Sequence, residues 1–293
     1  MRIGFIGLGN MGAPMAANLA RAGHEVAGFD TADIAVEGVR SADAIEAAVR
    51  DREAVITMLP DGPVLDAVYE RIVPLMPGGA LLLDCSTVDV DSAASAHRRA
   101  GQADLLSIDA PVSGGIGGAT AGSLTFMVGG SEAAVERARP LLEIMGQRVV
   151  HCGEAGAGQA AKICNNLLLG VSMIGACEAF SLGEKLGLSP ERLFEVISTS
   201  SGSCWSVNTY CPVPGVGPSS PADDGYAPGF AAELMLKDLC LSQRAAEQVG
   251  AATPMAARAE ALYARFVEHG GRGQDFSAML PALSAAARGD FDE

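Results

Sequence analysis

The chain has 293 residues, of which 49% are hydrophobic and 19% are charged, so it is long enough for two domains and is globular in composition. Its 35 acidic and 20 basic residues give a formal net charge of −15, which repels nucleic acid and anionic membranes. We therefore expect no nucleic-acid partner and no membrane partner. The seven cysteines are scattered without a C-x-x-C pair, which predicts reduced thiols, no metal site and a cytoplasmic protein.

Short apolar runs alternate with helical patterns in the first half of the chain. The expected strands are 2–7, 25–30, 54–59, 80–86, 105–110, 124–128 and 148–152, and the expected helices are 11–22, 63–75, 90–100 and 132–145. Nearly continuous apolar strands, each followed by a helix, are typical of a mostly parallel sheet that is covered on both faces. The pattern predicts an α/β domain of the doubly wound Rossmann type over residues 1–158.

The strand pattern ends after Cys152, and helical patterns follow. They cover 160–187, 190–199, 231–249, 254–269 and 277–287, with a loop rich in Pro, Gly and Ser at 211–229. The longest apolar run, 167–177, is too short to span a bilayer. We expect a long inter-domain helix that opens an all-α domain for substrate binding and oligomerisation, residues 159–293.

The stretch "GFIGLGNMG" contains G-x-G-x-x-G between a predicted strand and a predicted helix. The first glycine permits the tight turn, the second lets the backbone approach a pyrophosphate, and the third lets helix and strand pack closely. A strand–helix turn without a ligand is the alternative. The motif predicts a dinucleotide site on the helix N-terminus, formed by Gly7, Leu8, Gly9, Asn10, Met11 and Gly12.

The cofactor is expected to be NAD and not NADP. The second predicted strand ends at Asp30, whose carboxylate can accept hydrogen bonds from the ribose hydroxyls and repels a 2′-phosphate. No arginine follows before Arg40. The next strands end at "MLPD" and "DCST", so Leu59, Pro60 and Thr87 are candidates for the nicotinamide side of the crevice.

Lys162 is the candidate acid/base residue, because none of the four histidines has a catalytic context in the sequence. It follows the glycine-rich "GEAGAGQ" and is expected in the first turn of the long helix, where the helix dipole and apolar neighbours would lower its pKa. A neutral lysine can accept the proton of an alcohol. Asn166 is one turn further on the same face. The alternative is a solvated lysine.

Three further segments supply candidate contacts. In "DAPVSGG", Ser113 and the N–H groups of Gly114 and Gly115 can form a nest for a carboxylate, or they form an ordinary glycine turn between two strands. In "LMLKDL", Lys237 and Asp238 are candidates, with a solvated Glu233–Lys237 pair as the alternative. Trp205, the only tryptophan, is expected either to line an apolar subsite or to belong to the core.

Together these motifs resemble the β-hydroxyacid dehydrogenase family. The resemblance rests on "GFIGLGNMGAPMAANL", "DAPVSGG", "LTFMVGG", "GQAAKICNN", "SSGSCWS" with "PVPGV", and "LKDL", which cover nearly the whole chain. It implies NAD-dependent oxidation of a small 3-hydroxy acid, 3-hydroxyisobutyrate, to methylmalonate semialdehyde in valine breakdown. It also implies a homodimer or homotetramer that associates through the helical domains.

The resemblance also assigns roles. It makes Lys162 the catalytic residue, Asn166 and Ser113–Gly115 substrate contacts, and Lys237 a cofactor contact; Trp205 and Asp238 complete the expected substrate set. Reductases of tartronate, glyoxylate or succinic semialdehyde are the alternatives within the family. A non-catalytic NAD-binding sensor is the alternative from another class, and the presence of both Lys162 and Asn166 argues against it.

Overall fold

The computed structural model describes residues 1–285, and the chain forms two compact units, Met1–Lys162 and the part from Ile163 on. The predicted domain limits of 1–158 and 159–293 stay a prediction, because one helix, α7 (Ala157–Lys185), continues from the first unit into the second. The last two residues of the expected helix at 277–287 lie outside the described residues.

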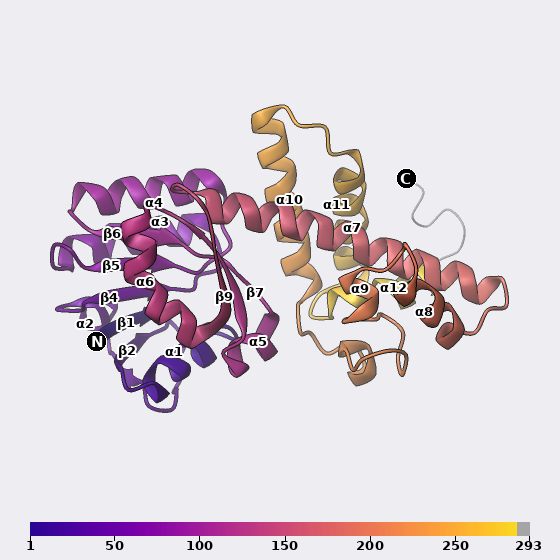
Figure 1. Ribbon diagram of the computed structural model, residues 1–293, viewed down its shortest axis with the longest axis horizontal. Helices are drawn as coiled ribbons and strands as arrows, with labels where there is room; N and C mark the ends of the chain where they lie inside the picture. The colour runs from indigo at the N-terminus through magenta and orange to yellow at the C-terminus, as the bar shows by residue number, and fades with distance from the viewer. Residues whose placement is uncertain (286–293) are drawn as a thin grey trace. The chain divides into compact units, whose positions relative to one another are not determined.

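The first unit is built on one sheet (Figure 1), whose strands follow the order β3-β2-β1-β4-β5-β6-β8-β7, with β9 beside β8. The strands are β1 (Arg2–Ile6), β2 (Glu25–Phe29), β3 (Arg40–Ser41), β4 (Ala54–Thr57), β5 (Leu81–Asp84), β6 (Leu106–Asp109), β7 (Val112–Ser113), β8 (Leu124–Gly129) and β9 (Gly146–Gly153). All pairs from β3 to β6 are parallel, and β8 runs antiparallel to β6 and β7. The prediction of a mostly parallel Rossmann sheet is confirmed.

The strand order reverses direction between β1 and β4. The chain moves outward from β1 through β2 to β3, then returns and continues outward on the other side from β4. In open α/β sheets, ligands bind in the crevice beside the carboxyl ends of the strands at this switch point. The fold therefore places the glycine motif after β1 and the "MLPD" segment after β4 on either side of one ligand crevice.

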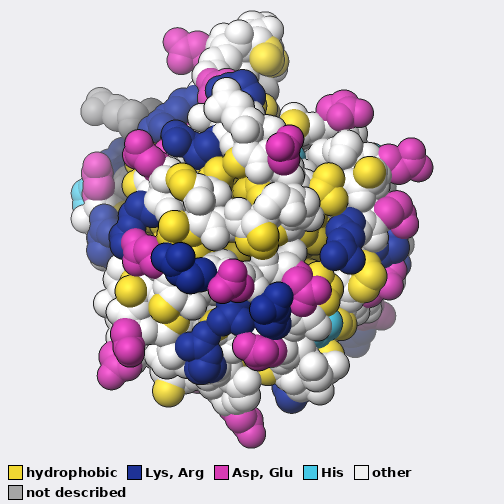
Figure 2. All heavy atoms as spheres, turned by 90° about the vertical axis from the view of Figure 1, so that its left-hand side faces the viewer, with side chains coloured by type: hydrophobic (Ala, Val, Ile, Leu, Met, Phe, Trp, Pro, Cys, Tyr) yellow, Lys and Arg dark blue, Asp and Glu magenta, His cyan; other side chains and the backbone are white. Residues whose placement is uncertain are grey.

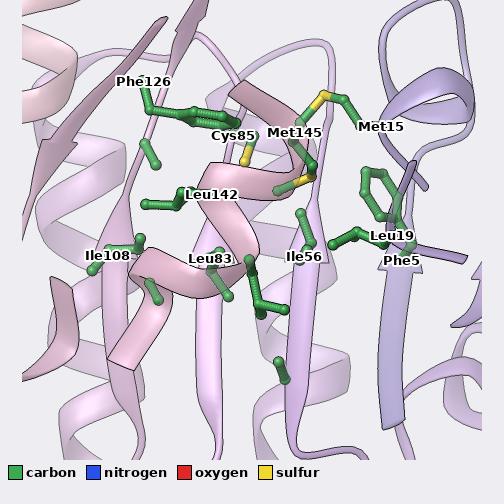
Figure 3. Close-up of a cluster of buried hydrophobic side chains, with 14 of the residues drawn as sticks. Phe5, Met15, Leu19, Ile56, Leu83, Cys85, Ile108, Phe126, Leu142 and Met145 are labelled. Atoms are coloured by element: carbon green, nitrogen blue, oxygen red, sulfur yellow. The ribbon is translucent and has the colours of Figure 1, made fainter. Parts of the chain in front are cut away.

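Helices cover both faces of the sheet. They are α1 (Gly12–Arg21), α2 (Ile45–Val49), α3 (Gly62–Ile72), α4 (Val90–Gln102), α5 (Gly115–Ala121) and α6 (Glu132–Met145), with a 3₁₀ turn at Val73–Leu75. Strand side chains alternate between faces: Phe5 packs with residues of α1 and α6, whereas its neighbour Ile6 packs with residues of α2, α3 and α4. Figure 3 shows Leu142 and Met145 of α6 packed over the sheet strands. Both faces are therefore buried, as near-continuous apolar strands require.

The regular elements of the second unit are helices within the described residues, apart from one isolated β-bridge between Ala231 and Asp275. After α7 follow α8 (Pro190–Thr199), α9 (Trp205–Asn208), α10 (Ala232–Val249), α11 (Pro254–Phe266), a π-helical turn (Val267–Gly271) and α12 (Met279–Ala285), with 3₁₀ turns at Pro221–Asp224 and Phe276–Ala278. Met173 of α7, Leu239 of α10 and Tyr263 of α11 meet in one core. The predicted all-α fold of the second half is confirmed.

Helix α7 is long and apolar enough to cross a membrane, with 29 residues and a mean hydropathy of 1.4 in its most apolar window. The shortness of the apolar run 167–177 therefore does not by itself exclude a membrane-spanning helix, since α7 is longer than that run. Its residues Met173, Ile174 and Cys177 are buried in the core of the second unit. This packing is that of a core helix of a globular unit.

The surface carries both signs of charge despite the net charge of −15. On the face shown in Figure 2, Lys and Arg side chains are interspersed with Asp and Glu side chains and with small apolar areas. The acidic excess does not form a single block on that face. Capture of an anionic ligand therefore depends on local groups at the end of the sheet.

Candidate active site

The glycine motif forms a tight loop between β1 and α1. Gly7 has φ +92°, and a Cβ there would lie 2.2 Å from the carbonyl oxygen of Met58. A Cβ on Gly12 would lie 1.9 Å from the carbonyl oxygen of Gly7. A Cβ on Gly9 would meet no atom within 4 Å. The packing of the protein thus requires the first and third glycines, and the open space at Gly9 suits a ligand that approaches the backbone.

Asp30 follows β2 and holds this loop. Its Oδ2 accepts a hydrogen bond from the Leu8 N–H at 2.6 Å, and its Oδ1 accepts one from the Ala32 N–H at 2.9 Å. The carboxylate borders a pocket of about 250 Å³ that also contains the carboxylates of Asp33 and Asp43. The remaining residues that line the pocket are Leu8, Gly28, Phe29, Thr31, Ala32, Ile34, Ser41 and Ala42.

Among the described residues, three carboxylates and no cation line this pocket, so its potential is negative. A ribose with free hydroxyls can donate hydrogen bonds to such a wall, whereas a 2′-phosphate is repelled by it. From the sequence, only Asp30 was expected to select NAD over NADP. The structure adds Asp33 and Asp43, which lie on the two segments that follow β2 and β3.

The segments after β4 and β5 are joined by a hydrogen bond. The Leu59 N–H donates to the Ser86 Oγ at 2.8 Å, and the Ser86 hydroxyl donates to the Asp84 Oδ1 at 2.6 Å. Leu59, Pro60 and Thr87 therefore follow strand ends whose relative position is set by buried polar contacts. Leu59 and Thr87 are partly exposed and Pro60 is exposed, as residues at the mouth of a crevice should be.

Asp84 is the buried acid at the end of β5. Burial raises its pKa to about 6, although hydrogen bonds from Ser86 and Thr57 act in the opposite direction. All the hydrogen bonds it accepts go to Oδ1, from the Thr57 hydroxyl at 2.8 Å and from the N–H and hydroxyl of Ser86. Because the folded state holds the proton more tightly than the unfolded state, charging this group costs stability.

We expect this cost to appear as a dependence of stability on pH. The folded pKa lies above the unfolded value, so the contribution of Asp84 is fully present below about pH 4 and is lost as the pH rises through 6. The wild-type free energy of unfolding should fall by roughly 1 kcal/mol between pH 5 and pH 7.5 from this group alone. Urea denaturation of wild type and Asp84→Asn at both pH values measures it; parallel pH dependences in the two proteins would contradict the expectation.

Lys162 lies in α7, and it is buried with 7% of its surface exposed. The prediction that it lies in the first turn is wrong, since α7 begins at Ala157 and places Lys162 in the second turn. The donors at the helix start are also occupied: the N–H groups of Gly156 and Gln159 donate to the carboxylate of Asp109. The helix dipole acts mainly within the first turn, so burial and not the dipole is the physical basis for a lowered pKa, which stays a prediction.

Ser113, Gly114 and Gly115 lie between β7 and α5. Gly114 has φ +135° and Gly115 has φ +61°, conformations that favour glycine, and α5 begins at Gly115. Ser113 and Gly115 are partly exposed, and Gly114 is exposed. The segment therefore presents accessible polar groups, and it joins a strand to a helix instead of a strand to a strand.

In the second unit, Asn166 is held by its neighbours. Its side-chain amide donates to the Asp238 Oδ2, and its Oδ1 accepts from the Asn165 side chain at 2.9 Å. The Lys237 Nζ lies 3.5 Å from the other carboxylate oxygen of Asp238. Asn166 and Asp238 are both buried, with 1% and 3% of their surfaces exposed. The structure thus brings three predicted residues together, and it gives Asn165 the role of a hydrogen-bond donor to Asn166.

Trp205 is not a core residue, because 48% of its surface is exposed. It begins the short helix α9 and stacks on Tyr210, with ring centroids 4.8 Å apart. The Tyr210 hydroxyl donates to the buried Asp275 at 2.9 Å. An exposed indole on a fixed aromatic support suits an apolar wall of a ligand site better than it suits core packing.

The contact between the His97 ring and the Asp109 carboxylate was not predicted from the sequence. The Nε2 of His97 lies 2.9 Å from the Asp109 Oδ1, and its Nδ1 lies 2.7 Å from the Ser107 Oγ. The contact depends on tertiary structure. His97 follows Ala96 of the buried side of α4, and Asp109 ends β6 directly beside Asp84 of β5.

Comparison with known proteins covers both halves of the chain. A family model described as the NAD binding domain of 6-phosphogluconate dehydrogenase matches residues 2–153. A second, described as NAD-binding of NADP-dependent 3-hydroxyisobutyrate dehydrogenase, matches residues 156–283. The first match ends four residues before α7 begins at Ala157, and the second match begins one residue before it.

Individual relatives match over nearly their full length. The 3-hydroxyisobutyrate dehydrogenase of Pseudomonas aeruginosa is 46% identical over 94% of this chain and 96% of its own. An NAD-dependent L-serine dehydrogenase from the same species is 45% identical over 95% of this chain and 96% of its own. A solved structure of the Mycobacterium tuberculosis 3-hydroxyisobutyrate dehydrogenase with L-serine has a TM-score of 0.91 and 48% identity, over 97% of this chain and 99% of that chain.

Proposed function

Because the chain belongs to the 3-hydroxyisobutyrate dehydrogenase family, we propose that it oxidises 3-hydroxyisobutyrate to methylmalonate semialdehyde with NAD. The observation that carries the proposal is the match to named dehydrogenases over 94% or more of the chain. The lysine, asparagine and glycine motifs fall within the matched length. Valine breakdown is the process in which this oxidation is a step.

The residues of the first unit suit NAD. The space at Gly9 admits a pyrophosphate at the start of α1, where the helix N-terminus favours an anion. The acidic pocket at Asp30 suits a ribose without a 2′-phosphate. We assign Gly7, Leu8, Gly9, Asn10, Met11, Gly12 and Asp30 to the diphosphate and ribose, and Leu59, Pro60 and Thr87 to the nicotinamide side. Lys237 stays a proposed cofactor contact on the resemblance alone.

The chemistry assigned to the chain is removal of one proton. When bound, NAD would supply the acceptor for the hydride that leaves the carbon bearing the hydroxyl group. The Lys162 amine takes the hydroxyl proton, which leaves an aldehyde, and it returns the proton in the reverse reaction. Burial of Lys162 (7% exposed) favours its neutral form. These assignments make Lys162 the acid/base residue of the reaction.

The remaining proposed contacts recognise the rest of the substrate. Ser113 and the N–H groups of Gly114 and Gly115 suit its carboxylate, and Trp205 suits its methyl group. Asn166 suits the hydroxyl oxygen. We place Asp238 behind Asn166, because its carboxylate holds the Asn166 amide and fixes which way that amide points.

L-Serine is a second candidate substrate, and a specific observation favours it. The P. aeruginosa L-serine dehydrogenase is 45% identical to this chain, and the M. tuberculosis structure was solved with L-serine. L-Serine, like 3-hydroxyisobutyrate, carries a primary hydroxyl group one carbon away from the carbon that bears the carboxylate. The same lysine and carboxylate contacts would therefore serve both substrates.

A steady-state panel tests the proposal. We expect the highest kcat/KM for 3-hydroxyisobutyrate with NAD among 3-hydroxyisobutyrate, 3-hydroxypropionate, L-serine, glycerate and 4-hydroxybutyrate, each measured with NAD and with NADP. A preference for L-serine would support the second candidate, and a preference for glycerate would support a tartronate semialdehyde reductase. No turnover with any of the five would support the NAD-binding sensor.

We also propose a cytoplasmic homodimer or homotetramer. Several large apolar side chains of the second unit are exposed, namely Leu168, Leu182, Leu186, Leu188 and Val196, and burial of such side chains favours association. Light scattering measures the mass in solution; a mass of 29.9 kDa, that of one chain, would contradict the oligomer.

A further inference from the structure

Buried hydrogen bonds fasten the first turn of α7 to the ends of β5 and β6. The Asp109 side chain is buried (1% exposed), and its Oδ1 accepts from the Gly156 N–H at 2.8 Å while its Oδ2 accepts from the Gln159 N–H at 2.8 Å. The first N–H groups of a helix have no partner within the helix. Asp109, at the end of β6, supplies such a partner to the Gly156 N–H, which lies 47 residues later in the chain.

Gln159 makes a second set of bonds with its side chain. Its Nε2 donates to the Ser86 carbonyl oxygen at 2.8 Å, and its Oε1 accepts from the Val88 N–H at 3.1 Å. These two partners flank Thr87. The side chain is fully buried, so both bonds are protected from water. One amide therefore fixes the Thr87 segment relative to the start of α7.

The backbone around Asp109 and Gln159 is closely packed. A Cβ on Gly158 would lie 2.4 Å from the Met127 carbonyl oxygen and 2.7 Å from that of Asp109. A Cβ on Gly129 would lie 2.4 Å from the Asp109 Oδ1. The helix start thus lies directly against β6 and β8, and only glycine at these two positions permits it.

His97 also contacts the Asp109 carboxylate. Its Nε2 lies 2.9 Å from the Asp109 Oδ1, and its Nδ1 is 2.7 Å from the Ser107 hydroxyl. The histidine side chain is 13% exposed. Oδ1 is thus shared by His97 and the Gly156 N–H while Oδ2 is held by the Gln159 N–H, and together these contacts fix the orientation of the carboxylate.

We propose that Asp109 and Gln159 are positioning residues for the oxidation. Lys162 lies three residues after Gln159, about 4.5 Å along the helix axis. Its place relative to Leu59 and Thr87 is set by the bonds of Gln159 and by the Ser86–Leu59 bond. A displacement of about 1 Å in a reacting group can cost on the order of a hundredfold in rate. The inference rests on the proposed function, in which Lys162 is the acid/base residue.

The test compares Gln159→Met and Asp109→Asn with Ser131→Ala. Gln159→Met keeps the size of the side chain but loses its hydrogen bonds to Ser86 and Val88. Asp109→Asn replaces one carboxylate oxygen by an NH2 group, which is a donor facing a backbone N–H donor. Ser131 caps α6 in the same unit, its side chain accepting from the Ala134 N–H, so its removal weakens a helix start that carries no proposed site residue. Thermal unfolding, kcat, KM and hydrogen exchange of the 156–162 amides are measured for each variant, with kcat taken well below Tm.

We expect Gln159→Met and Asp109→Asn to lower kcat about tenfold to a hundredfold, with KM for the hydroxy acid within threefold of wild type and faster exchange at 156–162. Ser131→Ala should lower Tm with kcat unchanged. If the two variants lose Tm like Ser131→Ala but keep kcat within twofold, their role is structural and the proposal is wrong. Absence of turnover in the wild-type protein would refute the proposed function. Unchanged hydrogen exchange of the 156–162 amides in the two variants would instead refute the claim that Asp109 and Gln159 hold the start of α7 in place.

Discussion

Replacing Lys162 with alanine is expected to lower kcat for oxidation of the hydroxy acid by about a hundredfold to ten-thousandfold, the range that general acid/base catalysis supplies. The variant keeps the glycine loop and the Asp30 pocket, since Lys162 belongs to neither. The affinity for NAD should therefore stay within about threefold of wild type. Steady-state kinetics and calorimetric titration with NAD measure the two quantities.

Lys185 provides the matched control for this experiment. It is the last residue of the same helix and is exposed, so Lys185→Ala removes a side chain of the same type from α7 without touching the proposed site. We expect its kcat to equal that of wild type. A Lys162→Ala variant that binds NAD normally and turns over near the wild-type rate would refute the acid/base assignment and would return Lys162 to the role of a structural cation.

The structure gives a different physical basis for a neutral Lys162 from the one that the sequence suggested. The sequence placed it at the positive end of a helix, but α7 begins at Ala157, and Asp109 sits at that end with its negative charge. A carboxylate there compensates the dipole. Burial of the lysine is then the remaining argument for a neutral amine, which stays a prediction, and burial depends on packing that no local pattern contains.

The elements that could be predicted are those with a strong apolar or helical period. The helix at 132–145 and the helix at 190–199 have the predicted bounds, because each begins after a serine cap and has one apolar face. The missed strands and helices are short: β3 and β7 have two residues each, α2 and α9 have five and four, and α5 is the glycine-rich "GIGGATA". Glycine has low helix propensity, so α5 has no signal in the sequence.

The candidate site divides in the same way. The residues of the glycine loop and Asp30 follow from one contiguous motif and its spacing, so the sequence contains them. The contacts of Asp109 with Gly156 and Gln159 join residues 47 and 50 positions apart, and the Asn166–Asp238 bond joins residues 72 positions apart. Such pairs arise from the order of the strands and the packing of helices, which composition and periodicity do not specify.

Replacing Asp30 with alanine is expected to lower the preference for NAD over NADP by about a hundredfold. The change removes one of three carboxylates from the pocket wall, which weakens repulsion of a 2′-phosphate. It also removes the acceptor for the Leu8 N–H and the proposed acceptor for the ribose hydroxyls, so KM for NAD should rise about tenfold. The ratio of kcat/KM for the two cofactors measures the preference.

Asp33→Ala separates the two contributions of Asp30. Asp33 is exposed and lines the same pocket, while the bond to Leu8 belongs to Asp30. The Asp33 variant should therefore admit NADP somewhat better and leave KM for NAD unchanged. Because Asp43 and one further carboxylate persist in each single variant, neither should come to prefer NADP. An NAD-to-NADP ratio that is the same in wild type and in Asp30→Ala would show that the carboxylate at the end of β2 does not select the cofactor, and that the selection lies elsewhere in the chain.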